Sequence, residues 1–92
     1  MVYLISYDIN EQLFDYADLK EVIKTLGDYQ HPMDSLWFVS TDNPDMEGIY
    51  RRLKACLRMK KDHILVLNIP NGTKRQGWMP KSFWKWLRAQ YD

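Results

Sequence analysis

An aspartate that ends one hydrophobic run and a serine that begins another are the residues of this chain best suited to chemistry. Asp8 follows residues 2–7, which are rich in the aromatic and β-branched types typical of a buried strand. A carboxylate at the end of such a strand calls for a compensating charge, a hydrogen-bond network or a metal ion. Mg²⁺ prefers oxygen ligands and can activate water for attack on a phosphodiester. Ser35, which precedes the hydrophobic residues 36–39, could place a hydroxyl nearby.

We therefore take Asp8 as a candidate metal ligand and catalytic residue, with Ser35 as a second catalytic candidate. A single aspartate holds a cation poorly, whereas two copies brought together by a two-fold axis would hold one better. The alternative for Asp8 is a turn-forming role, because aspartate commonly hydrogen-bonds the backbone where a loop begins. The other reactive side chains are weaker candidates for catalysis or metal binding. Cys56 falls on an apolar helix stripe, as a packing residue does, and His31 and His63 lack the spacing of zinc ligands.

Charge is distributed unevenly along the 92 residues, although the net charge is only +1. Residues 1–49 contain two basic and ten acidic side chains, whereas residues 50–92 contain eleven basic and two acidic ones. Such segregation is typical of a phosphate-binding surface or of a charge-complementary partner. The alternative is that both halves fold into one domain and neutralise each other across it. If the basic half binds nucleic acid, the candidate residues are Arg51, Arg52, Lys54, Arg58, Lys74 and Arg75.

The hydrophobic pattern predicts four strands and two helices, followed by a C-terminal helix. We expect strands over residues 2–8, 29–33, 36–41 and 63–69, helices over 16–26 and 44–59, and a last helix starting near Pro80. Gly27 is the expected left-handed terminator of the first helix, and Asp42 or Asn43 would cap the second. This order predicts an α+β, ferredoxin-like split βαβ fold. Residues 1–69 would form the core, with residues 70–92 as an extension on the core or on a partner protomer.

The predicted arrangement leaves one face of the sheet without helices, and an open apolar face on so small a domain calls for a partner. The last helix carries two kinds of face, one with Phe83, Leu87 and Tyr91 and another with Lys81, Lys85 and Arg88. We expect the aromatic face to dock on the open sheet of this protomer or its partner, with Trp78 as part of the same cover. The alternative is that aromatic and basic side chains together stack bases and hold phosphates.

Length and composition indicate one domain with a single core. The single cysteine excludes an internal disulfide and is typical of a reducing compartment. No basic segment precedes the first strand as in a signal peptide, and no apolar stretch approaches the roughly 18 residues of a membrane span. We therefore expect a cytoplasmic protein without a membrane partner.

Two segments resemble a known family. The strand Tyr3-Leu4-Ile5-Ser6-Tyr7-Asp8-Ile9 resembles the opening strand of the second core CRISPR-associated protein, in which a hydrophobic strand ends in an aspartate. The segment Asp34-Ser35-Leu36-Trp37-Phe38-Val39 resembles the family's later strand, which a serine precedes. The likeness spans about residues 1–69 and is greatest to the short chains of the SinR-like branch.

The resemblance implies a homodimer whose sheets pack face to face, with the two copies of Asp8 near the dimer axis. Some family members bind a divalent metal there, such as Mg²⁺, and cleave RNA or DNA. Others are non-catalytic scaffolds that hold DNA on basic surfaces, and toxin-like relatives also exist. Three functions therefore follow: a metal-dependent endonuclease, a non-catalytic nucleic-acid-binding or adaptor protein, and a toxin–antitoxin component. The loop at residues 10–15 departs from the family because it is acidic where relatives carry basic residues, and it would repel phosphates.

Overall fold

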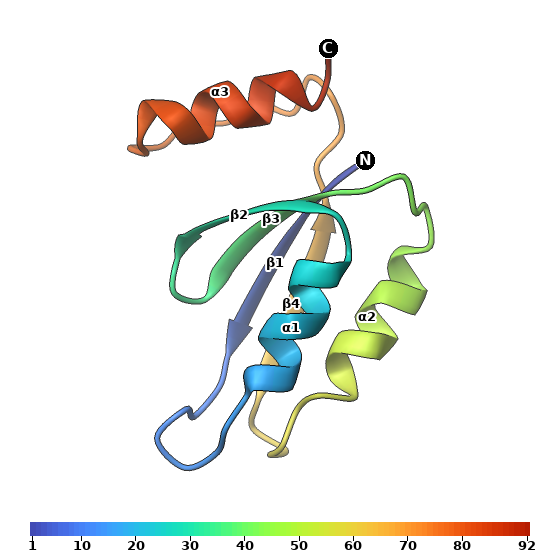
Figure 1. Ribbon diagram of the computed structural model, residues 1–92, viewed down its shortest axis with the longest axis vertical. Coiled ribbons are helices and arrows are strands. Elements are labelled where there is room, and N and C mark those ends of the chain that lie inside the picture. Colours follow the sequence, from blue (N-terminus) through green and yellow to red (C-terminus); the bar gives the residue numbers. More distant parts are fainter.

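The computed structural model describes all residues, 1–92, and contains four strands and three helices (Figure 1). In chain order these are β1 (Val2–Asp8), α1 (Ala17–Thr25), β2 (Asp28–Met33), β3 (Leu36–Ser40), α2 (Met46–Lys54), β4 (His63–Asn68) and α3 (Lys81–Ala89). The α+β class predicted from the sequence is confirmed, and the elements follow one another in the predicted order. None of the three helices is both long and apolar enough to cross a membrane.

The strands form one antiparallel sheet in the order β2-β3-β1-β4. β1 is central because it pairs with β3 on one side and β4 on the other, so that Leu4 lies opposite both Phe38 and Leu67. Successive side chains of a strand point to opposite faces of its sheet. Tyr3 and Ile5 therefore point to one face, and Leu4 points to the other. α1 and α2 cover the first face, whereas α3 lies at the end of the sheet where β1 begins (Figure 1).

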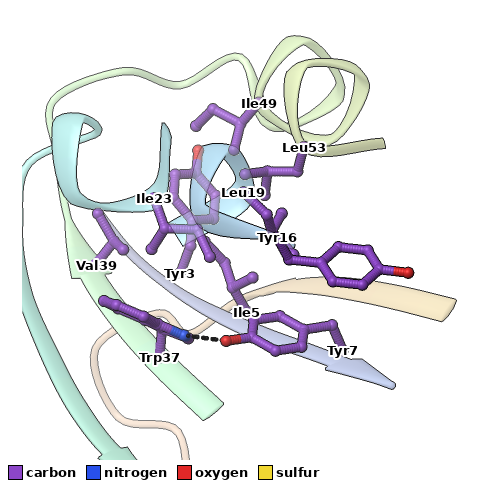
Figure 2. Packing of buried hydrophobic residues seen from close by; sticks show 10 residues of the cluster. All are labelled: Tyr3, Ile5, Tyr7, Tyr16, Leu19, Ile23, Trp37, Val39, Ile49 and Leu53. Carbon is purple, nitrogen blue, oxygen red and sulfur yellow. Dashed lines mark hydrogen bonds between the residues drawn. The ribbon is translucent and has the colours of Figure 1, made fainter. Parts of the chain in front are cut away.

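The face of the sheet toward α1 and α2 carries the larger core (Figure 2). Its ten buried residues are Tyr3, Ile5, Tyr7, Tyr16, Leu19, Ile23, Trp37, Val39, Ile49 and Leu53. Polar atoms inside this core are paired, since the Trp37 indole N–H donates to the Tyr7 hydroxyl at 2.9 Å and that hydroxyl donates to the carbonyl of Asp34 at 3.1 Å. Each large apolar side chain buried here stabilises the fold by about 1.5–3 kcal/mol. This layer is therefore the main apolar contribution to folding.

A second, smaller core joins α3 to the opposite face of the sheet. It consists of Val2, Phe38, Phe83 and Leu87, with the rings of Phe38 and Phe83 packed edge to face at 4.9 Å. The hydroxyl of Tyr91 also donates to the carbonyl of Ile69 at 2.5 Å, which ties the chain end to the end of the sheet. The apolar face of α3 thus docks on the sheet of its own chain.

The tryptophans of the extension differ in what they contact. Trp86 is half-buried, and its indole N–H donates to the carboxylate of Asp28 at 3.1 Å. Trp78 is 100% exposed, so the prediction that it belongs to the cover of the sheet is wrong. The physical reason lies in the loop between β4 and α3, which places Met79 against the small core and leaves Trp78 pointing into solvent.

Two helix boundaries differ from the sequence prediction. Gly27 does not adopt a left-handed conformation, and α1 ends on Leu26 with ordinary helical angles. Glycine is required at position 27 for a different reason, because a Cβ there would collide with the carbonyl oxygen of Ser40 in β3. At the start of α2 the N-cap is Asp45, whose side chain accepts the N–H of Gly48 at 2.9 Å, and neither Asp42 nor Asn43 caps the helix.

α2 also ends earlier than predicted, at Lys54 instead of Met59. In a longer helix, the N–H groups of Arg58 and Met59 would donate to carbonyls four residues earlier in the chain. Here both donate to the carboxylate of Asp62, each at 2.9 Å. This competing acceptor turns the chain away from the helix and toward β4.

Candidate functional site

Asp8 is the last residue of β1, where it is exposed and lies opposite His63 of β4. It lines an open hollow of ≈ 380 Å³ together with the loop that follows β1 and the segment that precedes β4. Two further carboxylates, Glu11 and Asp62, line the same hollow. The end of β1 therefore opens onto solvent beside an acidic loop, as expected for a site that small ligands could reach.

Ser35 lies beside this end of β1. The N–H of Tyr7, the residue before Asp8, donates to the carbonyl of Ser35 at 3.2 Å. The turn between β2 and β3 that carries Ser35 is further fixed by the Tyr7 hydroxyl, which donates to the carbonyl of Asp34. Ser35 is itself exposed. The structure thus brings the two catalytic candidates to the same end of the sheet.

The carboxylates around Asp8 do not form a metal site within one chain. No group of three histidine, cysteine, aspartate or glutamate side chains is close enough together to hold a metal ion. Glu11 is paired with Lys20 at 2.5 Å, and Asp62 accepts hydrogen bonds from the protein. Because a divalent cation needs several oxygen ligands, one copy of Asp8 does not fit Mg²⁺ by itself.

Asp62 is the residue that sequence reasoning missed. It is only 8% exposed, and its Oδ2 accepts from the Tyr16 hydroxyl at 2.6 Å and from the backbone N–H groups of Arg58 and Met59. Burial acts to raise the pKa of Asp62, but these hydrogen bonds and nearby His63 outweigh it, so the pKa lies below its ordinary value. The carboxylate therefore stays charged and joins α1 to the turn after α2. The sequence signal was an aspartate that borders a hydrophobic strand, although Asp62 precedes its strand whereas Asp8 ends one.

The predicted nucleic-acid-binding residues fall into two separate groups. Arg51, Arg52 and Lys54 are exposed on α2, with Arg58 just beyond it, and Lys74 and Arg75 lie in the loop before α3. Figure 1 shows the last turn of α2 near one end of the molecule and α3 at the other. The structure therefore does not unite the six residues in one patch.

Few of the basic side chains are neutralised by acidic ones. The three ion pairs of the chain are Lys20–Glu11, Lys24–Glu21 and Arg51–Glu47. Of the eleven basic residues in the second half of the chain, only Arg51 thus has an acidic partner. Arg58 instead lies over the ring of Phe14, and Arg75 over the ring of Tyr91, at 5.8 and 5.3 Å from the ring centroids. The acidic first half and the basic second half of the chain therefore do not neutralise each other through ion pairs, apart from Arg51–Glu47.

Comparisons with known proteins find a similar fold for this small α+β protein but do not assign it to a family. No family model matches the chain, and no curated protein matches it. The chain is similar to the crystal structure of a hypothetical protein, TT1823, from Thermus thermophilus. That match has a TM-score of 0.61 and 20% sequence identity, and covers 86% of this chain and 93% of the other. At such identity the likeness shows the fold alone.

Proposed function

We propose that the protein is a nucleic-acid-binding homodimer with a ferredoxin-like core, of the CRISPR-associated type that its sequence resembles. One observation carries this proposal: ten of the eleven basic side chains after residue 50 have no ion-pair partner. Unpaired lysines and arginines are available to neutralise phosphates and release counterions, which is the main source of affinity for nucleic acid. The strand order β2-β3-β1-β4 supports the ferredoxin-like core.

The homodimer is supported by apolar side chains that α3 does not cover. Leu65 and Leu67 of β4 point away from α1 and α2 and are 52% and 44% exposed. Met33, at the end of β2, is 51% exposed. Exposed apolar surface on a sheet favours burial against another protein. A second copy packed against this face would bury these residues.

Salt titration tests nucleic-acid binding. The affinity for labelled duplex should fall linearly on a log–log plot against salt concentration. The double variant Arg52→Ala/Lys54→Ala should reduce the slope by about 1.8, since each phosphate contact on duplex contributes roughly 0.9. Lys24→Ala is the matched control, because Lys24 is paired with Glu21 on the acidic half and should not change the slope. An affinity that does not depend on salt would contradict the proposal.

Phosphodiester cleavage is the second candidate function, favoured by the placement of Asp8 and Ser35 at one end of the sheet. Because one chain lacks the ligands for Mg²⁺, this candidate requires two copies of Asp8 to meet at a two-fold axis and hold the cation together.

Cleavage of labelled RNA and DNA with and without Mg²⁺ tests this second function. Asp8→Asn should abolish the Mg²⁺-dependent cleavage, because the amide removes the carboxylate that would hold the cation in each copy. Asp42→Asn, at an exposed aspartate outside the hollow, is the control. Cleavage that survives in Asp8→Asn, or the lack of cleavage by the unmodified protein, would exclude a nuclease centred on Asp8.

A further inference from the structure

A hollow of ≈ 340 Å³ in the C-terminal extension is lined by two arginines and a tryptophan. Its lining residues are Arg75, Gln76, Gly77, Trp84 and Arg88. No acidic side chain lines it. Arginine suits phosphate because its planar guanidinium presents several donors in a fixed fork. The side chain of Arg75 is also partly ordered, since it lies over the Tyr91 ring and donates to the carbonyl of Thr73 at 3.4 Å.

A second, more apolar hollow of ≈ 390 Å³ adjoins the first. The two hollows share Arg75, Gln76, Gly77 and Trp84. The second hollow extends from there over the sheet to Leu4, Leu36 and Phe38 and is bordered by Trp78. Positive charge and apolar aromatic surface thus lie side by side on the residues that both hollows share.

Trp78 is the only large hydrophobic side chain that is fully exposed. The backbone beside it is held close to α3, since a Cβ on Gly77 would lie 3.6 Å from the Trp84 ring. Because this loop is already held in place, a ligand can bind to the flat face of the exposed indole with little loss of conformational entropy. Such a surface is suited to a ligand that is itself flat and aromatic.

The charged side chains that the extension itself carries before Asp92 are all basic. No acidic residue occurs between Asp62 and Asp92, whereas five basic residues do: Lys74, Arg75, Lys81, Lys85 and Arg88. None of the five forms an ion pair. A ligand that enters here therefore meets positive charge on a segment with no acidic residues of its own.

From these observations we infer that the extension is a binding site for single-stranded nucleic acid. Arg75 and Arg88 contact phosphates, while Trp78 and Trp84 stack unpaired bases at the apolar hollow. Bases in a duplex are already stacked and paired, so they cannot reach the indole rings, whereas unpaired bases can. The inference rests on the proposed function and specifies its substrate class. It also gives the basic residues near α3 a role separate from those on α2.

Anisotropy of short labelled oligothymidine, oligouridine and a duplex of equal length tests the inference. Trp78→Ala should weaken binding of both single strands by about 5- to 150-fold, the range expected for one stacked base. Trp78→Phe should retain most of the affinity because it keeps a ring. Because Trp78 is fully exposed, neither change should disturb folding. Leu13→Ala, which removes another large apolar side chain that is 65% exposed in the acidic loop, is the control and should have no effect.

The contribution of the arginines is measured separately. Arg88→Ala should reduce the slope of log affinity against log salt by about 0.7 on a single strand, the value for one phosphate contact. An unchanged affinity in Trp78→Ala would overturn the inference, as would a weaker self-association of that variant with no effect on oligonucleotides. If the duplex binds but single strands do not, the inference fails and the proposed function stands. If neither binds, both fail.

Discussion

At the scale of single residues, Asp62 shows how one carboxylate can organise three segments. Its Oδ2 accepts one hydrogen bond from Tyr16, the residue before α1, and two from backbone N–H groups after α2. All three hydrogen bonds need an acceptor oxygen on Asp62, which the charged carboxylate provides. The hydrogen bonds therefore couple the protonation of Asp62 to the stability of the fold.

Asp62→Asn tests this coupling. The pKa of Asp62 is lower in the folded chain than in the unfolded one, so its charge stabilises the fold above the unfolded value of about 3.9. This contribution is lost as the pH falls through the lowered folded pKa. Thermal unfolding followed by circular dichroism should show the variant less stable at neutral pH, with the difference shrinking below about pH 4. A difference that is independent of pH would contradict the role of the charge.

Asp42→Asn is the control for that experiment, because Asp42 is exposed and its side chain makes no hydrogen bond. Its melting temperature should follow that of the unmodified protein at every pH.

The sequence predicted the positions of Asp8 and Ser35 better than it predicted their surroundings. Both residues border hydrophobic runs, and strand ends are visible in sequence because apolar residues give way to polar ones. Asp62 also borders a strand, but its partners are backbone groups and Tyr16, which lies 46 residues away. Contacts over such a separation leave no periodic signal, so the role of Asp62 had to come from the structure.

At the scale of elements, α3 depends on few residues for its attachment to the sheet. Phe83 and Leu87 are its two buried positions. Leu87→Ala should reduce the free energy of unfolding by about 2–5 kcal/mol, since it removes a buried side chain and leaves a cavity. Leu13→Ala, at a residue 65% exposed, should change it by no more than about 0.5 kcal/mol. Equal effects of both changes in urea unfolding would mean that α3 does not pack as described.

The elements themselves were predictable to different degrees. The strands were found within about one residue of their bounds. Aromatic and β-branched runs mark β1, β3 and β4, whereas β2 was placed by the bend at Asp34 and Ser35 that separates it from β3. The end of α2 was not predicted correctly. The sequence after Lys54 is compatible with a longer helix, and only the structure shows that Asp62 accepts the backbone N–H groups that would continue it. The reason for Gly27 was also invisible in sequence, because the close approach of Ser40 belongs to the tertiary structure.

At the scale of the whole molecule, the uncovered part of the sheet leads to a prediction about assembly. If a second copy packs on this face, Leu65→Lys should shift the protein from dimer to monomer, because a charged group would enter an apolar interface. Sedimentation equilibrium would measure the change. Leu13→Lys, at a comparably exposed leucine in the loop after β1, should leave the assembly unchanged. A protein that is monomeric without any substitution would argue against the homodimer.

The central place of β1 has a consequence for how the chain acquires its structure during synthesis. β1 is made before both of its neighbours in the sheet, β3 and β4, and Tyr3 lies opposite Asn68. Contacts between residues so far apart close late and slow folding. Until β4 has been made, one edge of an aromatic, β-branched strand stays unpaired and can associate with other chains. We therefore expect that substitutions which lower the β propensity of β1 reduce any dependence on chaperones and raise the yield from rapid expression.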